Sequence, residues 1–155
     1  MALTNQRVIP IALFIVALGL VAARVAVSLT KREPSKSGGV QWLTPEEGMR
    51  LAANSNKLVL LDFTADWCRP CHVLDAEVFQ NPEIAKSINE RFVPIRVVDR
   101  RREEGRNAPE VTELQQRFAV RGFPTVIFAD RNGERARMEG FGGRERFEQT
   151  MESVR

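Results

Sequence analysis

Residues 58–79 read LVLLDFTADWCRPCHVLDAEVF, and this stretch decides the fold. Its first part, residues 58–63, is a nearly continuous apolar run, which is typical of a strand buried on both faces of a sheet. We expect a helix to follow from about Cys68 to Phe79. The stretch therefore predicts a buried strand followed directly by a helix that begins at a Cys-x-x-Cys pair.

The two cysteines are predicted to lie at the N-terminus of this helix. Unpaired backbone N–H groups and the helix dipole stabilise an anion there, so the Cys68 thiol should ionise readily. Arg69 and His72 add positive charge nearby. Cys71, one turn further in, is suited to attack a mixed disulfide formed by Cys68, and Pro70 fixes the backbone between them. The pattern predicts a redox-active pair.

Other interpretations of the same residues stay open. The two cysteines could be buried structural residues or a disulfide that does not turn over. Residues 68–72 also spell C-x-x-C-H, the motif of covalent c-type haem attachment. In that case His72 would be one axial ligand of the haem iron, and Met138 or Met151 would be the other. The expected strand and helix order favours a redox fold over a small helical haem protein.

Periodicity and turn signals predict the remaining elements. A capping box at residues 44–47 begins a first helix. Residues 131–133, Arg-Asn-Gly, predict a type I′ hairpin turn, and the highly charged residues 99–108 predict a loop. We expect helices at 45–54, from 81, at 109–118 and at 144–154, and further strands at 92–98, 125–129 and 134–138. This order indicates an α/β sandwich around a small mixed sheet.

Residues 58–79, together with RGFPTVIFADRNGE at residues 121–134, resemble the thioredoxin superfamily. The resemblance spans residues 42–155. Within it, ADWC, the later VF and NPEI are similar to the C-terminal domain of membrane thiol:disulfide interchange proteins of the DsbD type. The resemblance implies a thioredoxin-like three-layer sandwich with a mixed central sheet.

The resemblance also implies roles for three catalytic residues. Cys68 would be the attacking thiol and Cys71 the resolving thiol of a redox-active disulfide. Asp62 would be the buried carboxylate behind the pair, and it would assist proton transfer to or from Cys71, because burial raises the pKa of a carboxyl group. The resemblance implies no cofactor and no metal.

Three further residues would bind the substrate according to the resemblance. Trp67 would pack beside the disulfide, Pro124 would be a cis-proline opposite the active site, and Phe123 would offer its backbone to an extended substrate segment. The sequence departs from cytosolic thioredoxin at Arg69, usually glycine, and at His72, usually lysine. Both changes bear on the thiol pKa and so on the direction of electron flow.

Charge and cysteine content narrow the function classes. The net charge of the 155 residues is +3, but five basic residues and one acidic residue lie within residues 1–40, so the remainder is nearly neutral. The basic residues therefore flank an apolar segment and do not predict a nucleic-acid partner. Two cysteines are too few for a disulfide-stapled scaffold.

The N-terminal part is predicted to be a membrane anchor. Residues 8–29 are almost entirely apolar, and as a helix they would span about 33 Å, enough for a hydrocarbon core of about 30 Å. The alternative is a signal peptide cleaved near residues 21–23. We expect residues 1–7 to be a flank, residues 30–41 a linker and residues 42–155 the thioredoxin-like domain.

These observations predict a membrane-tethered thiol:disulfide oxidoreductase. Its partners would be client proteins with disulfides or thiols and a membrane redox protein that exchanges electrons with it. The resemblance favours reduction of clients, with the domain on the periplasmic side, although basic residues after the apolar segment favour the cytoplasm. The alternative from another class is a non-catalytic binding or assembly module with a static cysteine pair.

Overall fold

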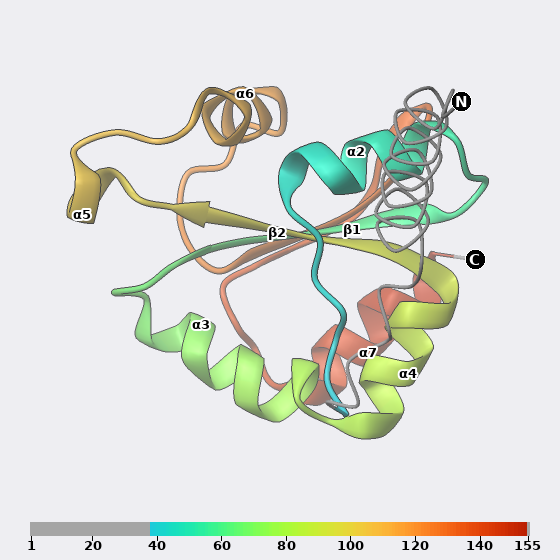
Figure 1. The fold of residues 1–155 in the computed structure, drawn as a ribbon. Helices are drawn as coiled ribbons and strands as arrows, with labels where there is room; N and C mark the ends of the chain where they lie inside the picture. The colour runs from blue at the N-terminus through green and yellow to red at the C-terminus, as the bar shows by residue number, and fades with distance from the viewer. Residues whose placement is uncertain (1–37, 155) are drawn as a thin grey trace, which may run out of the picture. The chain divides into compact units, whose positions relative to one another are not determined.

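The computed structural model describes residues 38–154, so the predicted flank, anchor and most of the linker lie outside the described residues. Among residues 38–154, no helix is both long enough and apolar enough to span a bilayer. The elements, drawn in Figure 1, are α2 (Pro45–Ala53), β1 (Leu58–Ala65), α3 (Arg69–Leu74), a π-helical segment η1 (Asp75–Phe79), α4 (Pro82–Arg91), β2 (Phe92–Asp99), α5 (Arg101–Glu104), α6 (Pro109–Arg117), β3 (Thr125–Asp130), β4 (Gly133–Glu139) and α7 (Arg144–Ser153).

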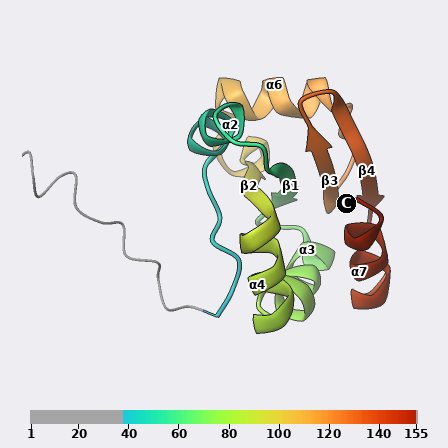
Figure 2. The same cartoon turned by 90° about the vertical axis from the view of Figure 1, so that its right-hand side faces the viewer.

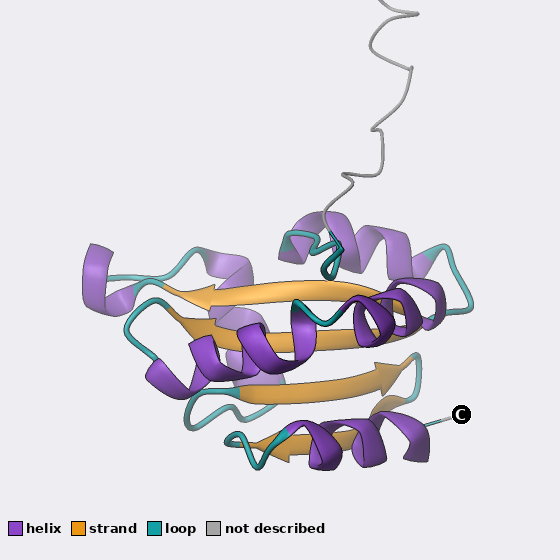
Figure 3. Ribbon diagram, turned by 90° about the horizontal axis from the view of Figure 1, so that it is seen from below, coloured by secondary structure: helices purple, strands orange, loops and turns teal. Residues whose placement is uncertain are grey.

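The four strands form one mixed sheet in the order β2-β1-β3-β4. β1 pairs in parallel with β2 and antiparallel with β3, and β3 pairs antiparallel with β4. Helices cover both faces: α2 and α6 lie on one side, and α3, α4 and α7 lie on the other (Figures 2 and 3). The predicted α/β sandwich with a mixed sheet is confirmed.

The central strands alternate their side chains between two apolar layers, because successive strand residues point to opposite faces. Leu60 and Phe128 belong to the layer under α4 and α7. Leu61, Phe63 and Ile127 belong to the layer under α2 and α6. This double burial explains why residues 58–63 read as a continuous apolar run.

The segment before α2 is tied to the domain by backbone hydrogen bonds. The Val40 N–H donates to the Phe79 carbonyl at 3.0 Å. The Leu43 N–H donates to the Pro94 carbonyl at 3.0 Å, and the Arg96 N–H donates to the Leu43 carbonyl at 3.0 Å. We call residues 39–43 the strap; its last residue, Leu43, pairs in parallel with Ile95 at the β2 edge of the sheet.

The helix predicted over residues 68–79 is divided in the structure. Cys68 is the extended N-cap residue and α3 begins at Arg69. At Asp75 the helix widens into η1, where the Gln80 N–H donates to the Asp75 carbonyl at 2.9 Å across five residues. A π-helical turn of this kind often occurs at functional sites, and here it lies one turn beyond the cysteines.

Two other local predictions are wrong. Residues 99–108 are not all loop, because Arg101–Glu104 form α5, which ends at Gly105 with φ of 75°. The hairpin turn is not type I′, because among the described non-glycine residues only Ala119 has a positive φ. The Asp130 carboxylate instead accepts the Asn132 N–H at 2.7 Å, which stabilises a turn of ordinary handedness.

Candidate redox site

Cys68 and Cys71 form a disulfide at the N-terminus of α3. Their sulfurs are 2.02 Å apart and their Cα atoms 5.3 Å apart. The side chain of Cys68 caps the helix, since its Sγ accepts the Cys71 N–H at 3.2 Å. Once the disulfide is reduced, the same N–H and the helix dipole are placed to stabilise a Cys68 thiolate. The geometry fits a nucleophilic Cys68.

An apolar cluster encloses the disulfide. Cys68 is 2% exposed and Cys71 is 6% exposed, and both pack with Ala65 and Phe123. The Phe123 ring meets the Trp67 ring edge to face at 5.9 Å between centroids. Trp67 is 47% exposed. The structure thus brings Trp67 into contact with Phe123, which packs on the disulfide, and leaves about half of the Trp67 side chain exposed.

The loop before β3 carries the predicted proline. The Phe123–Pro124 peptide bond is cis, and Pro124 is buried. The Pro124 carbonyl accepts the Gly140 N–H at 2.8 Å, and the Thr125 hydroxyl donates to the Gly122 carbonyl at 2.8 Å. These bonds anchor the loop on both sides of the proline, and so hold Phe123 against the cysteines.

Asp62 is a buried carboxylate in the middle of β1. It is 2% exposed. Its Oδ2 accepts the Arg96 Nε–H at 3.0 Å, whereas its Oδ1 has no hydrogen-bond partner among residues 38–154. Burial raises the pKa of Asp62 to about 6, with Arg96 opposing the rise and Asp75 adding to it. Asp62 can therefore take up or release a proton near neutral pH.

Arg96 links two carboxylates and was not predicted from the sequence. It is the register partner of Asp62 on β2. Its Nη2 donates to Asp75 Oδ1 at 2.6 Å, and its guanidinium lies 4.3 Å from the centroid of the Trp42 ring. The sequence did hold a signal for the pair of Arg96 and Asp62. Arg96 is a charged residue within the apolar run 92–98, just as Asp62 is within the apolar run 58–63, and two such charges of opposite sign suggest an ion pair between neighbouring strands.

His72 is fixed to the turn before the cysteines. Its Nε2 lies 2.8 Å from the Asp66 carbonyl oxygen, and because a carbonyl can only accept, Nε2 carries the hydrogen. The disulfide meanwhile uses both sulfurs that haem thioethers would need. Both features oppose the C-x-x-C-H haem interpretation. Arg69 and His72 are exposed beside the pair, as the sequence suggested.

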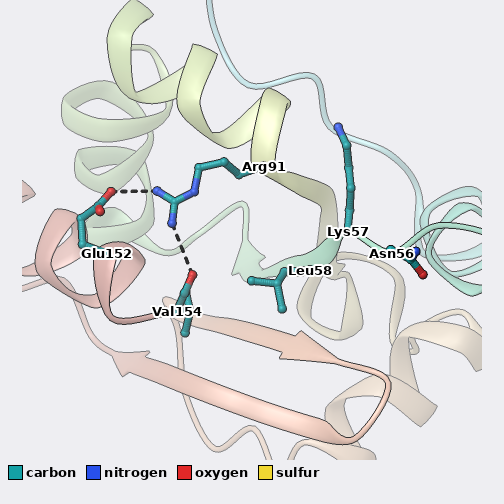
Figure 4. Close-up of a pocket in the computed structure, with 6 residues that line it drawn as sticks. All are labelled: Asn56, Lys57, Leu58, Arg91, Glu152 and Val154. Carbon is teal, nitrogen blue, oxygen red and sulfur yellow. Dashed lines mark hydrogen bonds and ion pairs between the residues drawn. The ribbon is translucent and has the colours of Figure 1, made fainter.

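A cavity of about 620 Å³ lies at the opposite end of β1 from the cysteines. Its lining contains no cysteine: it comprises Asn56, Lys57, Leu58, Arg91, Glu152 and Val154 (Figure 4). Arg91 closes one side by pairing with Glu152 at 2.7 Å and donating to the Val154 carbonyl at 3.3 Å. The cavity lies between the end of α4 and the end of α7, away from the two cysteines.

Comparisons with known proteins agree with this geometry. A family model described as a thioredoxin-like domain matches residues 45–155. The thiol:disulfide interchange protein DsbD of Photorhabdus laumondii is 29% identical over 107 residues, which cover 67% of this chain and 18% of that protein. The chain therefore spans about a fifth of the length of the curated relatives it matches.

Two solved structures are similar over most of this chain. The oxidised C-terminal domain of DsbD from Neisseria meningitidis is 28% identical, with a TM-score of 0.54, and the match covers 71% of this chain and 90% of that one. A DsbH oxidoreductase is 24% identical, with a TM-score of 0.62, and the match covers 81% of this chain and 92% of that one. The second likeness concerns the fold alone.

Proposed function

The chain belongs to the thioredoxin-like family of thiol:disulfide oxidoreductases, and we propose that it is a membrane-tethered reductant of protein disulfides that acts through Cys68 and Cys71. Membership confirms the resemblance predicted from the sequence. The observation that carries the proposal is the Cys68–Cys71 disulfide at the N-terminus of α3, packed against Phe123 beside a cis-proline.

The proposed reaction moves two electrons from the dithiol to the client. The Cys68 thiolate attacks one sulfur of the client disulfide, so a Cys68–client bond forms, the client S–S bond breaks and one client thiolate leaves. Cys71 then loses its proton and attacks Cys68 Sγ. The Cys68–Cys71 bond forms, the second client thiolate leaves, and both client thiolates take up protons.

Asp62 is proposed to accept the Cys71 proton in the second step. Its raised pKa, about 6, is suited to this because a carboxylate that ionises near the working pH can both take and return a proton. The unpartnered Oδ1 is the oxygen available for that exchange. Trp67, Phe123 and Pro124 are proposed to hold an extended client segment across the disulfide.

The electron supply and the location complete the proposal. Each turnover leaves Cys68 and Cys71 oxidised, so a second dithiol, carried by a membrane redox partner, must reduce them. The apolar residues 8–29 would tether the domain to the membrane, and thiol exchange with secreted clients would place it on the periplasmic side.

The test is to trap the client complex in cells. Replacing Cys71 with Ser removes the resolving thiol, so Cys68 should accumulate in mixed disulfides, visible as reducible adducts on non-reducing gels. A Cys68→Ser, Cys71→Ser double variant is the matched control and should show none. Absence of adducts, together with full cellular function of Cys68→Ser, would instead support the non-catalytic module.

A further inference from the structure

The loop that follows β2 is built around one buried carboxylate. Asp99 accepts hydrogen bonds from Asn107 at 2.8 Å, from Gln115 at 2.9 Å and from the Arg101 backbone and side chain at 3.1 and 3.0 Å. The Arg100 N–H in turn donates to the Asn107 side chain at 2.6 Å. The charged segment is therefore held in one conformation, and α5 has a fixed place at the end of β2.

That place is beside the active-site turn. Arg100 forms an ion pair with Asp66, and the Arg102 guanidinium lies 5.2 Å from the centroid of the exposed Trp67 ring. Asp66 and Trp67 directly precede Cys68. The loop thus brings two cations to the residues that border the disulfide, and one of them lies over the aromatic side chain proposed to meet the client.

Three exposed arginines belong to the segments that meet at Trp67, and we call them the arginine rim. Arg102 lies over Trp67, Arg69 stands between the cysteines, and Arg121 is two residues before Phe123, whose ring contacts Trp67. Within residues 38–154, none of the three belongs to an ion pair.

The acidic residues nearby do not neutralise the rim. Asp66 is already paired with Arg100. Glu103 and Glu104 follow Arg102 on α5, but neither belongs to an ion pair within residues 38–154. The segments that border the redox site thus carry three exposed arginines without ion pairs, and one of them contacts the exposed Trp67.

We propose that the arginine rim docks an acidic segment of the protein partner next to that partner's reactive cysteine. Carboxylates of the segment would pair with the three arginines while its apolar atoms cover Trp67. This inference rests on the proposed function, since it names the chemistry of the partner for the same site. Opposite charges would raise the association rate and orient the partner's disulfide toward Cys68.

The test compares two peptide disulfides that are identical except for flanking residues, which are glutamates in one and lysines in the other. The reduced full-length protein in detergent is mixed with each, and oxidation is followed by tryptophan fluorescence. At low salt the glutamate peptide should react at least about fivefold faster. The preference should fall below about twofold in 0.5 M salt, because exposed charges are then screened.

Variants assign the effect to the rim. Arg102→Glu with Arg121→Glu should abolish or reverse the preference, and Arg102→Gln with Arg121→Gln should weaken it. Arg50→Glu, the same substitution at a single position on α2, should preserve it. Equal rates for the two peptides in the unmodified protein, or an unchanged preference in the double variants, would overturn the inference.

A small uncharged disulfide separates this inference from the proposed function. Reduction of this small disulfide measures the reactivity of the cysteine pair without any docking. The variants at Arg102 and Arg121 should therefore reduce it as fast as the unmodified protein does. An equal rate would also show that these variants are folded. If the unmodified protein cannot reduce the small disulfide, the proposed function fails. If it can, and the peptides react equally, the docking surface alone fails.

Discussion

The burial of Asp62 changes its pKa, and the pKa decides whether this residue can transfer a proton. Its pKa is raised from an ordinary value of 3.8 to about 6, so the folded protein favours the protonated form. The carboxylate costs no stability below pH 4, and its full cost is reached above about pH 6. A charge that destabilises the fold at neutral pH is expected where a proton must move.

Asp62→Asn should slow the resolving step by about 100-fold near pH 7, because Cys71 loses the proton acceptor that we propose for it. In the unmodified protein this step should accelerate between pH 5 and 7 with a midpoint near 6, and the midpoint should be absent from the variant. Stopped-flow fluorescence of the mixed disulfide measures both. A midpoint that persists in Asp62→Asn would assign it to another group.

The same variant should be more stable, which excludes unfolding as the reason for slow resolution. Removing the buried carboxylate should raise the free energy of unfolding of the oxidised protein by about 2–3 kcal/mol at pH 8. The gain should vanish below pH 4, where Asp62 is protonated in both the folded and unfolded states. Urea unfolding at the two pH values provides the measurement.

Arg96→Met should move the midpoint of the resolving step upward by about one pH unit, because the cation that opposes the rise of the Asp62 pKa is lost. Arg96→Lys keeps a positive charge and should move it less. The midpoint is read from the pH dependence of the same fluorescence signal. Identical midpoints in all three proteins would show that Arg96 serves packing against Trp42 alone.

The cysteine pair and Asp62 could be recognised as candidate site residues from the sequence. The cysteines have the Cys-x-x-Cys spacing, and Asp62 is a charged residue within an apolar strand. The sequence did not reveal the partner of Asp62, since the register that sets Arg96 opposite Asp62 depends on how β1 and β2 align in space. The contact of Arg96 with Asp75 depends further on η1, which no periodicity signals. The sequence alone does not say which residues of different strands and helices lie next to each other.

At the level of elements, the apolar strands could be predicted from their hydrophobic pattern, and the helices from their hydrophobic periodicity and their N-cap residues. α2 has its capping box at Thr44 and Glu47 as expected. The misjudged segments were short: η1 and α5 have five and four residues, and such lengths carry no periodic signal. α5 is bonded through Arg101 to Asp99, and side chains from α6 and the following loop bond to the same carboxylate. Only the folded chain brings these groups together.

Asp99→Ala should destabilise the protein by about 2–3 kcal/mol at pH 7, because the half-buried Asn107 and the buried Gln115 lose their hydrogen-bond acceptor. Burial acts to raise the pKa of Asp99, but the bonds from Asn107, Gln115 and Arg101 outweigh it and lower the pKa. The stabilisation is therefore present above pH 4 and is lost as the pH falls further. Urea unfolding measures it.

Asp66→Ala is the matched control for Asp99→Ala. It removes the exposed partner of Arg100, and exposed ion pairs contribute about 0–1 kcal/mol. Equal losses in the two variants would contradict the view that Asp99 organises the segment. Larger loss at Asp99, with greater proteolysis near residues 100–107, would agree with it.

At the scale of the whole molecule, the predicted anchor makes the location testable. The full chain should sediment with membranes and resist alkaline carbonate extraction, whereas a chain lacking residues 8–29 should be recovered in the supernatant, because no other apolar segment of such length follows. Protease added to intact spheroplasts should degrade the domain. Protection until lysis would place it in the cytoplasm.

The strap gives the domain a mechanical property. Its hydrogen bonds to Asn89, Phe79, Pro94 and Arg96 would oppose a pull from the N-terminal side. Such a load would pass into η1, which continues the helix that begins at the cysteines, and into β2, which pairs with β1. A pull on the predicted N-terminal anchor would therefore reach the two elements next to the cysteine turn through these few hydrogen bonds.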